Sequence, residues 1–325
     1  MKGKLPGVLR LLAALGAALL ILLVPISMLL LPVSRQLYNA QELGASVRHP
    51  PSWSPVETES KTEIRPTAVR KSPPWFKAAF QARSWMGHDD LGRSLLFRLL
   101  PGFLVSLVVG LSAAAISVII GATWGVVAGY AGGRLDLVMM RIVDVLQGLP
   151  YILLVILLKV GLSRPLIAWF GGNSRTVDLV ILVMAVSGVS WLTMARMVRT
   201  QVLSIRSLGF VEAAKACGAG PFHILRRHVL PNLTGTIIVY ATLVVPQAIL
   251  QESFLSFLGI GIQQPTPSLG RLAADGVQAV NTFVGYWWLL VFPCGLLVLT
   301  LLTLNVLGDW LLDRLDPRLG SVSPP

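Results

Sequence analysis

Long apolar runs separated by short charged segments dominate the pattern along the chain. Six windows contain no Asp, Glu, Lys or Arg, and they cover residues 11–32, 99–133, 145–158, 179–195, 229–251 and 276–308. Most of these windows are long enough to cross about 30 Å of hydrocarbon as an α-helix. The pattern therefore predicts an all-α, polytopic membrane protein with six transmembrane helices.

The third window is shorter than the others, so we place it within a longer apolar helix at 137–160. Charged residues lie near both ends of that helix, where long side chains can reach a polar surface. Pro150 lies inside the expected span, and a proline in a helix interior produces a kink. The sequence therefore predicts a kinked third span, in which Pro150 is either a hinge or a packing feature.

The remaining segments divide the chain into an anchor, a loop, a membrane domain and a tail. The first window is too long for the apolar region of a typical signal peptide, so we expect residues 1–35 to hold a cytoplasmic end and a retained first helix. Residues 36–98 contain the Pro-rich pieces "RHPPSWSP" and "KSPPWF" and predict a long, partly extended external loop. We expect a membrane domain over 99–318 and a tail over 319–325.

Composition supports the membrane assignment and argues against nucleic acid. The chain is 54% hydrophobic and 13% charged, with a mean hydropathy of +0.72. Its net charge is +12, but the basic residues are spread between apolar runs and form no contiguous patch. The connection from Arg196 to Arg227 holds six Lys/Arg and one acid, Glu212, so we expect it and both termini to be cytoplasmic. The expected location is a cell membrane.

No motif for cofactor or metal chemistry accompanies these helices. The sequence lacks a Gly-rich loop ending in Gly-Lys-Ser/Thr, so we expect no ATP site in this chain. Cys217 and Cys294 fall in a loop and a span, and the four histidines are scattered. We predict no bound cofactor, no metal and no enzyme activity.

The most polar stretch between two apolar runs is "FVEAAKACGAGPFHILRRHVLPN". Phe210 to Cys217 is rich in helix formers, and Gly218 follows where a left-handed residue ends a helix. Pro221 is well placed to start a second helix over 222–229, which meets Pro231 as the next span begins. The stretch predicts a helix-turn-helix elbow.

Two interpretations of this elbow stay open on the residues alone. Its first helix has a small face of alanines, Ala213, Ala214 and Ala216, which allows close approach by another protein. Arg226 and Arg227 equally suit a connector that lies on an anionic lipid surface. The elbow is therefore a docking site or an amphipathic connector.

The elbow resembles the EAA loop of permease subunits in ATP-binding-cassette importers. The general pattern has an aliphatic residue where His228 stands, but the ending "RHVLPN" resembles the dipeptide/oligopeptide/nickel permease branch. The positions that match the EAA spacing are Glu212, Ala213, Ala214, Gly218, Leu230 and Pro231.

Other blocks resemble the second-type ("C") permease of the same branch. "GHDDLGRSLLFRL" is similar to "GTDxLGRDxxSRL", with departures at His88, Ser94 and Phe97, so we carry no hydrogen-bond network over to this turn. "MRIVDVLQGLP", "LQESFLSFLGIGIQQPTPSLG" and "LNVLGDWLLDRLDPR" also look like family blocks, and they occur in the family's order.

This resemblance implies a type I ABC importer permease with a MetI-like fold. Such a permease forms half of a pathway with a second permease in a heterodimer, in the inner or plasma membrane. Two ATPase subunits bind ATP and Mg, and an extracytoplasmic solute-binding protein delivers a dipeptide, an oligopeptide or a nickel-type solute. The resemblance makes the first helix of the loop at 206–232 the helix that couples to an ATPase.

Two acids near or within the spans leave alternatives open. Asp144 lies three residues after Arg141 and either pairs with it or faces the pathway or the second permease. Glu252 lies about 30 Å along a helix from Asn232. It therefore falls near the external surface, where it either lines an outer gate or pairs with Arg271.

A self-sufficient secondary transporter or channel is the alternative function. A carrier coupled to ions is expected to have buried acids near the midplane and internal repeats. The midplane windows here are uncharged and we find no clear repeat. The sequence therefore favours the importer subunit.

Overall fold

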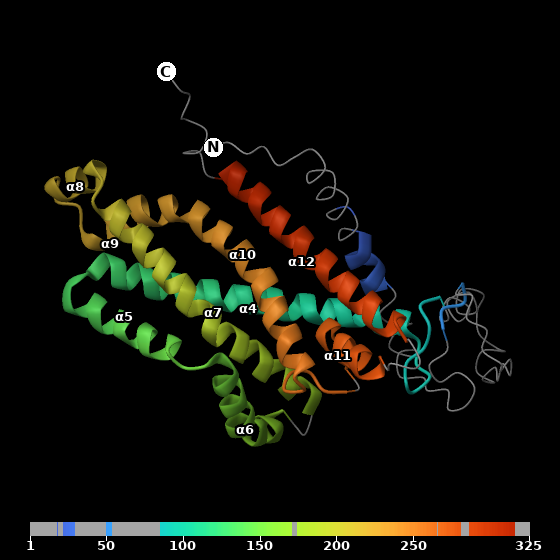
Figure 1. The fold of residues 1–325 in the computed structure, drawn as a ribbon. Coiled ribbons are helices and arrows are strands. Elements are labelled where there is room, and N and C mark those ends of the chain that lie inside the picture. The colour runs from blue at the N-terminus through green and yellow to red at the C-terminus, as the bar shows by residue number, and fades with distance from the viewer. Residues whose placement is uncertain are drawn as a thin grey trace. The chain divides into compact units, whose positions relative to one another are not determined.

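The computed structural model describes residues 18, 22–29, 50–53, 85–170, 174–264, 266–280 and 286–315. Within them the chain is helical, with one isolated β-bridge between His88 and Ser94 (Figure 1). Most of the expected first span, most of the loop at 36–98 and the tail at 319–325 lie outside the described residues.

From Leu95 onward, the described helices follow one another along the chain. They are α4 (Leu95–Ala131), α5 (Gly133–Gln147), α6 (Tyr151–Trp169), α7 (Ser174–Arg206), α8 (Gly209–Ala216), α9 (Pro221–Ile224), the π-helix η1 (Leu225–Val229), α10 (Leu230–Phe257), α11 (Leu269–Ala279) and α12 (Trp288–Leu315). Five helices in the described ranges are long and apolar enough to cross a membrane, and they cover Leu95–Ala131, Tyr151–Trp169, Thr176–Arg206, Pro221–Phe257 and Trp288–Leu311.

The predicted third span over 137–160 is wrong, because the chain breaks inside it. α5 ends before Gly148, and Pro150 is the residue that precedes the first turn of α6. A proline cannot donate a helix hydrogen bond, and it pushes the residue before it away from helical angles. Pro150 therefore marks a boundary between two helices, where we predicted a kink within one.

Lys159, one of the charged residues near the ends of the predicted span, therefore lies in the interior of α6. Its Nζ is 3.8 Å from Oδ1 of Asp178 on α7. The charge thus faces an acid on the next helix and does not have to reach the membrane surface.

The last predicted span is also displaced. Residues at the start of the window 276–308 complete α11, and the spanning helix begins only at Trp288. Ser268 caps the start of α11, and its Oγ accepts a hydrogen bond from the backbone N–H of Arg271 at 3.2 Å. The uncharged residues at the end of α11 therefore made the window longer than the part of it that belongs to the membrane-spanning helix α12.

Two compact units make up the fold, and we describe each by itself. One contains the described residues up to Val108 together with Glu252–Thr300. The other contains Val109–Gln251 and the described residues from Leu301 onward.

The second unit has a close backbone contact between α4 and α7. Glycines recur at every fourth position of α4, which places them on one face of the helix. A Cβ on any of the three would lie within 2.9 Å of an α7 atom, and the pairs are Gly121 with Met194, Gly125 with Ala195 and Gly129 with Val202. This contact therefore requires residues without side chains.

Candidate functional site

The first helix of the elbow, α8, is anchored along one side. Val211 is fully buried and joins an apolar cluster that includes residues of α7, α9, η1 and α10. Glu212 and Ala213, the next residues in the helix, are exposed. The packing of Val211 therefore fixes α8 on the unit and leaves its other side open to solvent or to a partner. The buried members of the cluster are Val126, Met194, Val198, Val202, Ile205, Val211, Ile224, Val229 and Leu233.

The turn after α8 confirms the predicted helix end. Gly218 has a φ of +80°, in the left-handed region that glycine adopts without strain. Its N–H donates to the carbonyl of Lys215 at 2.9 Å, and the N–H of Ala219 donates to the carbonyl of Ala214 at 3.0 Å. This pair of bonds is the Schellman arrangement, which satisfies carbonyls at the helix end.

The second half of the elbow differs from the prediction. Pro221 does begin α9, as expected, but the helical backbone does not stop at Val229. α9, η1 and α10 are contiguous, so the elbow continues directly into the spanning helix (Figure 1). Pro231 has no N–H to donate, and the preceding turn is widened, with Leu230 N–H donating to the carbonyl of Leu225. The wide turn thus carries the helix into the segment that holds Pro231.

The structure places the predicted coupling residues together in this elbow. Glu212, Ala213, Gly218, Leu230 and Pro231 are exposed, whereas Ala214 and His228 are half-buried. Two aromatic residues of the elbow were not among the predicted coupling residues.

The first is Phe210, whose ring centroid lies 6.0 Å from that of His228. The second is Phe222, which is 73% exposed. A large apolar side chain within a polar segment was the available signal for both.

Comparison with known families decides what this elbow belongs to. The family "Binding-protein-dependent transport system inner membrane component" matches residues 121–321, which include the whole elbow. The chain belongs to this family. It is thus an ABC importer permease, as the sequence blocks implied.

Relatives of the permease carry peptide-transport names. It is 48% identical to the dipeptide transport system permease protein DppC of Bacillus subtilis over 73% of this chain and 70% of the relative. It is 41% identical to the oligopeptide permease OppC of the same organism, over 72% of each chain. OppC of Escherichia coli K12 is 43% identical, again over 72% of each chain. The named relatives support the C-type assignment.

Solved structures support the fold of the permease. A chain of the MetNI methionine ABC transporter in an inward-facing conformation matches with a TM-score of 0.55 and 21% identity. The match covers 68% of this chain and 98% of that chain. The type I importer permease fold is therefore the fold of the permease.

Asp144 has a different partner from the one we named. Its Oδ1 accepts from Nη2 of Arg196 on α7 at 2.6 Å, so the expected pairing with Arg141 is wrong. About two helical turns before Asp144, Asp136 accepts hydrogen bonds from both Nε and Nη2 of Arg199. The two ion pairs line a cavity of about 460 Å³ between α5 and α7, together with Gly133, Leu137, Met140, Arg141 and Thr200.

Glu252 is fully buried, so it lines no open gate in this structure. The expected pairing with Arg271 is also wrong, because that arginine lies 3.1 Å from Oδ1 of Asp275. The Glu252 carboxylate accepts instead from the hydroxyls of Ser106 at 2.7 Å and Ser256 at 2.8 Å. Ser253 contributes a longer contact of 3.4 Å.

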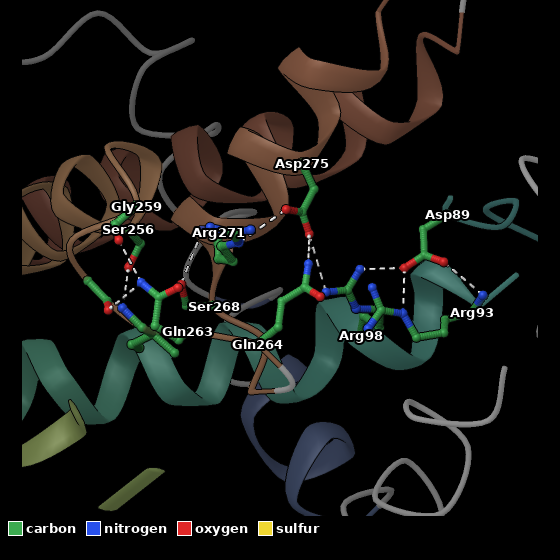
Figure 2. A network of polar contacts seen from close by, with 12 residues as sticks. Asp89, Arg93, Arg98, Ser256, Gly259, Gln263, Gln264, Ser268, Arg271 and Asp275 are labelled. Atoms are coloured by element: carbon green, nitrogen blue, oxygen red, sulfur yellow. Dashed lines mark hydrogen bonds and ion pairs between the residues drawn. The ribbon is translucent and has the colours of Figure 1, made fainter. Parts of the chain in front are cut away.

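A charged network beside α11 was not predicted from the sequence. Figure 2 shows Arg98 of α4 between Asp89 and Asp275. Its Nη1 donates to Oδ2 of Asp89 at 2.6 Å, and its Nη2 lies 3.4 Å from Oδ2 of Asp275. Arg93 donates to the same Asp89 oxygen at 2.7 Å. The network ties the 87–94 turn, the start of α4 and α11 together within the first unit.

Two more residues on the same face of α4 contact α11. Arg98, Gly102 and Ser106 are four residues apart and so lie on one side of the helix. A Cβ on Gly102 would meet Leu272 at 3.3 Å, and Oγ of Ser106 accepts from the N–H of Leu269 at 3.2 Å. α11 is therefore held along α4 by an ion pair, a close approach and a hydrogen bond.

Proposed function

We propose that the permease imports peptides and that α8 is the helix that docks on an ATPase subunit. The exposed side of α8, anchored from behind by Val211, is the observation that carries the proposal. Short helices are unstable alone, and this one already has its apolar anchor within the chain. Its open side of small residues is then free for a groove on a partner.

The partners follow from membership in the family. We assign the transporter two ATPase subunits, a second permease that completes the pathway and an extracytoplasmic solute-binding protein. ATP and Mg bind to the ATPase subunits, and the permease itself breaks no bond in the solute. We assign the elbow connection and both termini to the cytoplasmic side of the cell membrane, because the positive residues of the connection favour that side.

The mechanism uses the helical continuity of the elbow. Closure of the ATPases on ATP displaces α8, and α9 and η1 carry this displacement directly into α10. ATP and the loaded binding protein both favour the outward-facing arrangement of a two-state cycle. Glu212, Ala213 and Gly218 act mechanically, as parts of the docking surface and its turn.

Peptides are the solute class that the relatives support. The relatives named above are dipeptide and oligopeptide permeases, and none of these names supports the nickel part of our expectation. Uptake of a labelled dipeptide by cells that express the complete transporter, with competition by unlabelled peptides or Ni²⁺, checks the class. Competition by Ni²⁺ alone would contradict it.

Co-purification tests the docking assignment. Gly218→Pro forbids the φ of +80° and removes the N–H that bonds Lys215, so α8 loses its end. We expect this variant to retain the second permease and lose the ATPase subunits. Gly220→Ala is the matched control, because Gly220 has a φ of −67° and a Cβ there meets nothing within 4 Å. Equal ATPase recovery in both variants would make the elbow a connector only.

A second pair of variants tests the surface without disturbing the turn. Ala213→Trp adds bulk on the exposed side of α8, and Ser207→Trp adds the same bulk at an exposed position just before α8. We expect only the former to lose ATPase subunits, because close approach needs small residues. Loss in neither variant would place the ATPase contact elsewhere.

A further inference from the structure

Glu252 is an acid of α10 that the coupling mechanism leaves unused. Its side chain is fully buried, and within the described part of the chain no Lys, Arg or His pairs with it. A buried charge without hydrogen-bond partners is costly. The hydroxyl groups that donate to the Glu252 carboxylate are therefore what stabilises it. Ser106, Ser253 and Ser256 supply these donors.

Two of the serines each make a second hydrogen bond. Oγ of Ser106 accepts from the N–H of Leu269, and Oγ of Ser256 accepts from the N–H of Ile262, both at 3.2 Å. A hydroxyl has one hydrogen and two lone pairs. Because a carboxylate only accepts, it takes the hydrogen of each serine and leaves the lone pairs for these backbone N–H groups. Glu252 therefore orients both hydroxyls.

The segment between α10 and α11 is also packed against α10 with no space to spare. A Cβ on Gly261 would lie 2.4 Å from Oγ of Ser256. A Cβ on Gly270 would lie 2.3 Å from Cα of Ser253. Neither position admits a side chain, so the connecting segment touches α10 at Gly261, and the first turn of α11 touches α10 at Gly270.

We propose that Glu252 is a positioning residue that fastens Ile262 and the start of α11 to the end of α10. Movement of α10 in the transport cycle then reaches α11 and is not absorbed by the connecting segment. This inference rests on the proposed function, because α10 is the helix that continues from the elbow. Glu252 acts through Ser106 and Ser256 and does not touch solute.

Glu252→Gln tests the acceptor requirement with almost no change in shape. One of its two terminal atoms becomes an NH₂ group, which donates and cannot accept from a serine. In either orientation of the amide, one serine then faces two donors and has no acceptor for its own hydrogen. Ser106→Ala removes one of the two links directly.

The measurement is the ATPase rate of the complete transporter in lipid nanodiscs, with and without peptide-loaded binding protein. For Glu252→Gln and Ser106→Ala we expect stimulation by the binding protein to fall about tenfold, the value of one lost hydrogen bond to a charged group. The concentration of binding protein that gives half of the remaining stimulation should not change. A binding protein that docks less well would raise that concentration and contradict the assigned role.

Ser117→Ala is the matched control on the same helix. Ser117 is also fully buried, but its Oγ donates only to the carbonyl of Ala113 within α4. The double variant Glu252→Gln/Ser106→Ala should lose less stimulation than the sum of the two single losses, because both changes act on one connected set of hydrogen bonds.

Each remaining outcome decides between the two proposals. Stimulation in Glu252→Gln and Ser106→Ala equal to that in Ser117→Ala would overturn the role of Glu252. If Glu252→Gln fails to assemble, Ser106→Ala decides alone by the same criterion. A wild-type complex that holds ATPase subunits but shows no stimulation by any binding protein would overturn the proposed function itself.

Discussion

At the scale of single residues, the chain keeps charges buried by giving them fixed partners. Arg98 is 1% exposed and still has two carboxylates within 3.4 Å. Removing one partner of a buried ion pair leaves the other uncompensated, which costs more than the pair contributes. Loss of Arg98 should therefore destabilise the first unit.

Arg98→Ala should lower the stability of the permease by about 3–5 kcal/mol, because Asp89 and Asp275 lose a buried cation. Thermal unfolding of the detergent-purified complex measures this change. Arg134→Ala is the control, since Arg134 is an exposed arginine of α5. Equal melting temperatures for the two variants would show that the network adds no stability.

At the scale of elements, α5 and α7 are joined by two ion pairs in different environments. The carboxylate of Asp136 is 13% exposed and binds two nitrogens of Arg199, whereas that of Asp144 is 50% exposed and binds one nitrogen of Arg196. Exposed pairs contribute little because water screens them. The pair at Asp136 therefore holds the two helices.

Asp136→Asn should destabilise the complex by about 2 kcal/mol or more, and Asp144→Asn by less than about 1 kcal/mol. The reason is that the bidentate, largely buried pair loses a charge-assisted bond that water does not replace. Melting curves of the two variants side by side give the comparison. A larger effect at Asp144 would mean that this exposed acid has a role beyond the pair.

Sequence patterns predicted which segments are helical more accurately than they predicted where each helix begins and ends. Uncharged windows located the described spans, but the window at 145–158 hid the break at Pro150, and the window at 276–308 included part of α11. Hydropathy does not distinguish a spanning helix from an adjoining buried one. The turn at Gly218 was predictable because its signal is local.

The contacts of Glu252 and Arg98 were not predictable in this way. Each has a partner that is far away in the sequence, Ser106 for Glu252 and Asp275 for Arg98. Neither periodicity nor composition carries information about which distant residues meet. Family resemblance identified the blocks that hold these residues but gave them no partners.

At the scale of the whole molecule, the elbow of this membrane subunit carries an exposed cysteine that can be labelled chemically. Cys217 is exposed beside Gly218, whereas Cys294 lies within α12. Labelling of Cys217 by a maleimide that does not cross membranes therefore shows on which side of the membrane the elbow lies.

We expect Cys217 to react in inverted vesicles and not in intact spheroplasts, because positive connections stay on the cytoplasmic side. Added ATPase subunits should slow the labelling. Mass measurement of the labelled protein follows the reaction, with Cys217→Ser as the blank. Labelling from outside would reverse the proposed orientation.

The pairing of Lys159 with Asp178 also bears on how the permease is made. The ribosome delivers α6 before α7, and a lysine at the centre of a helix costs about 2.5–3.5 kcal/mol at the translocon. The neutralising acid arrives only with the next helix. α6 should therefore wait at the translocon and enter the bilayer together with α7. Nascent chains that stop after α6 should insert poorly unless they carry Lys159→Leu, and chains that stop after α7 should insert without that change.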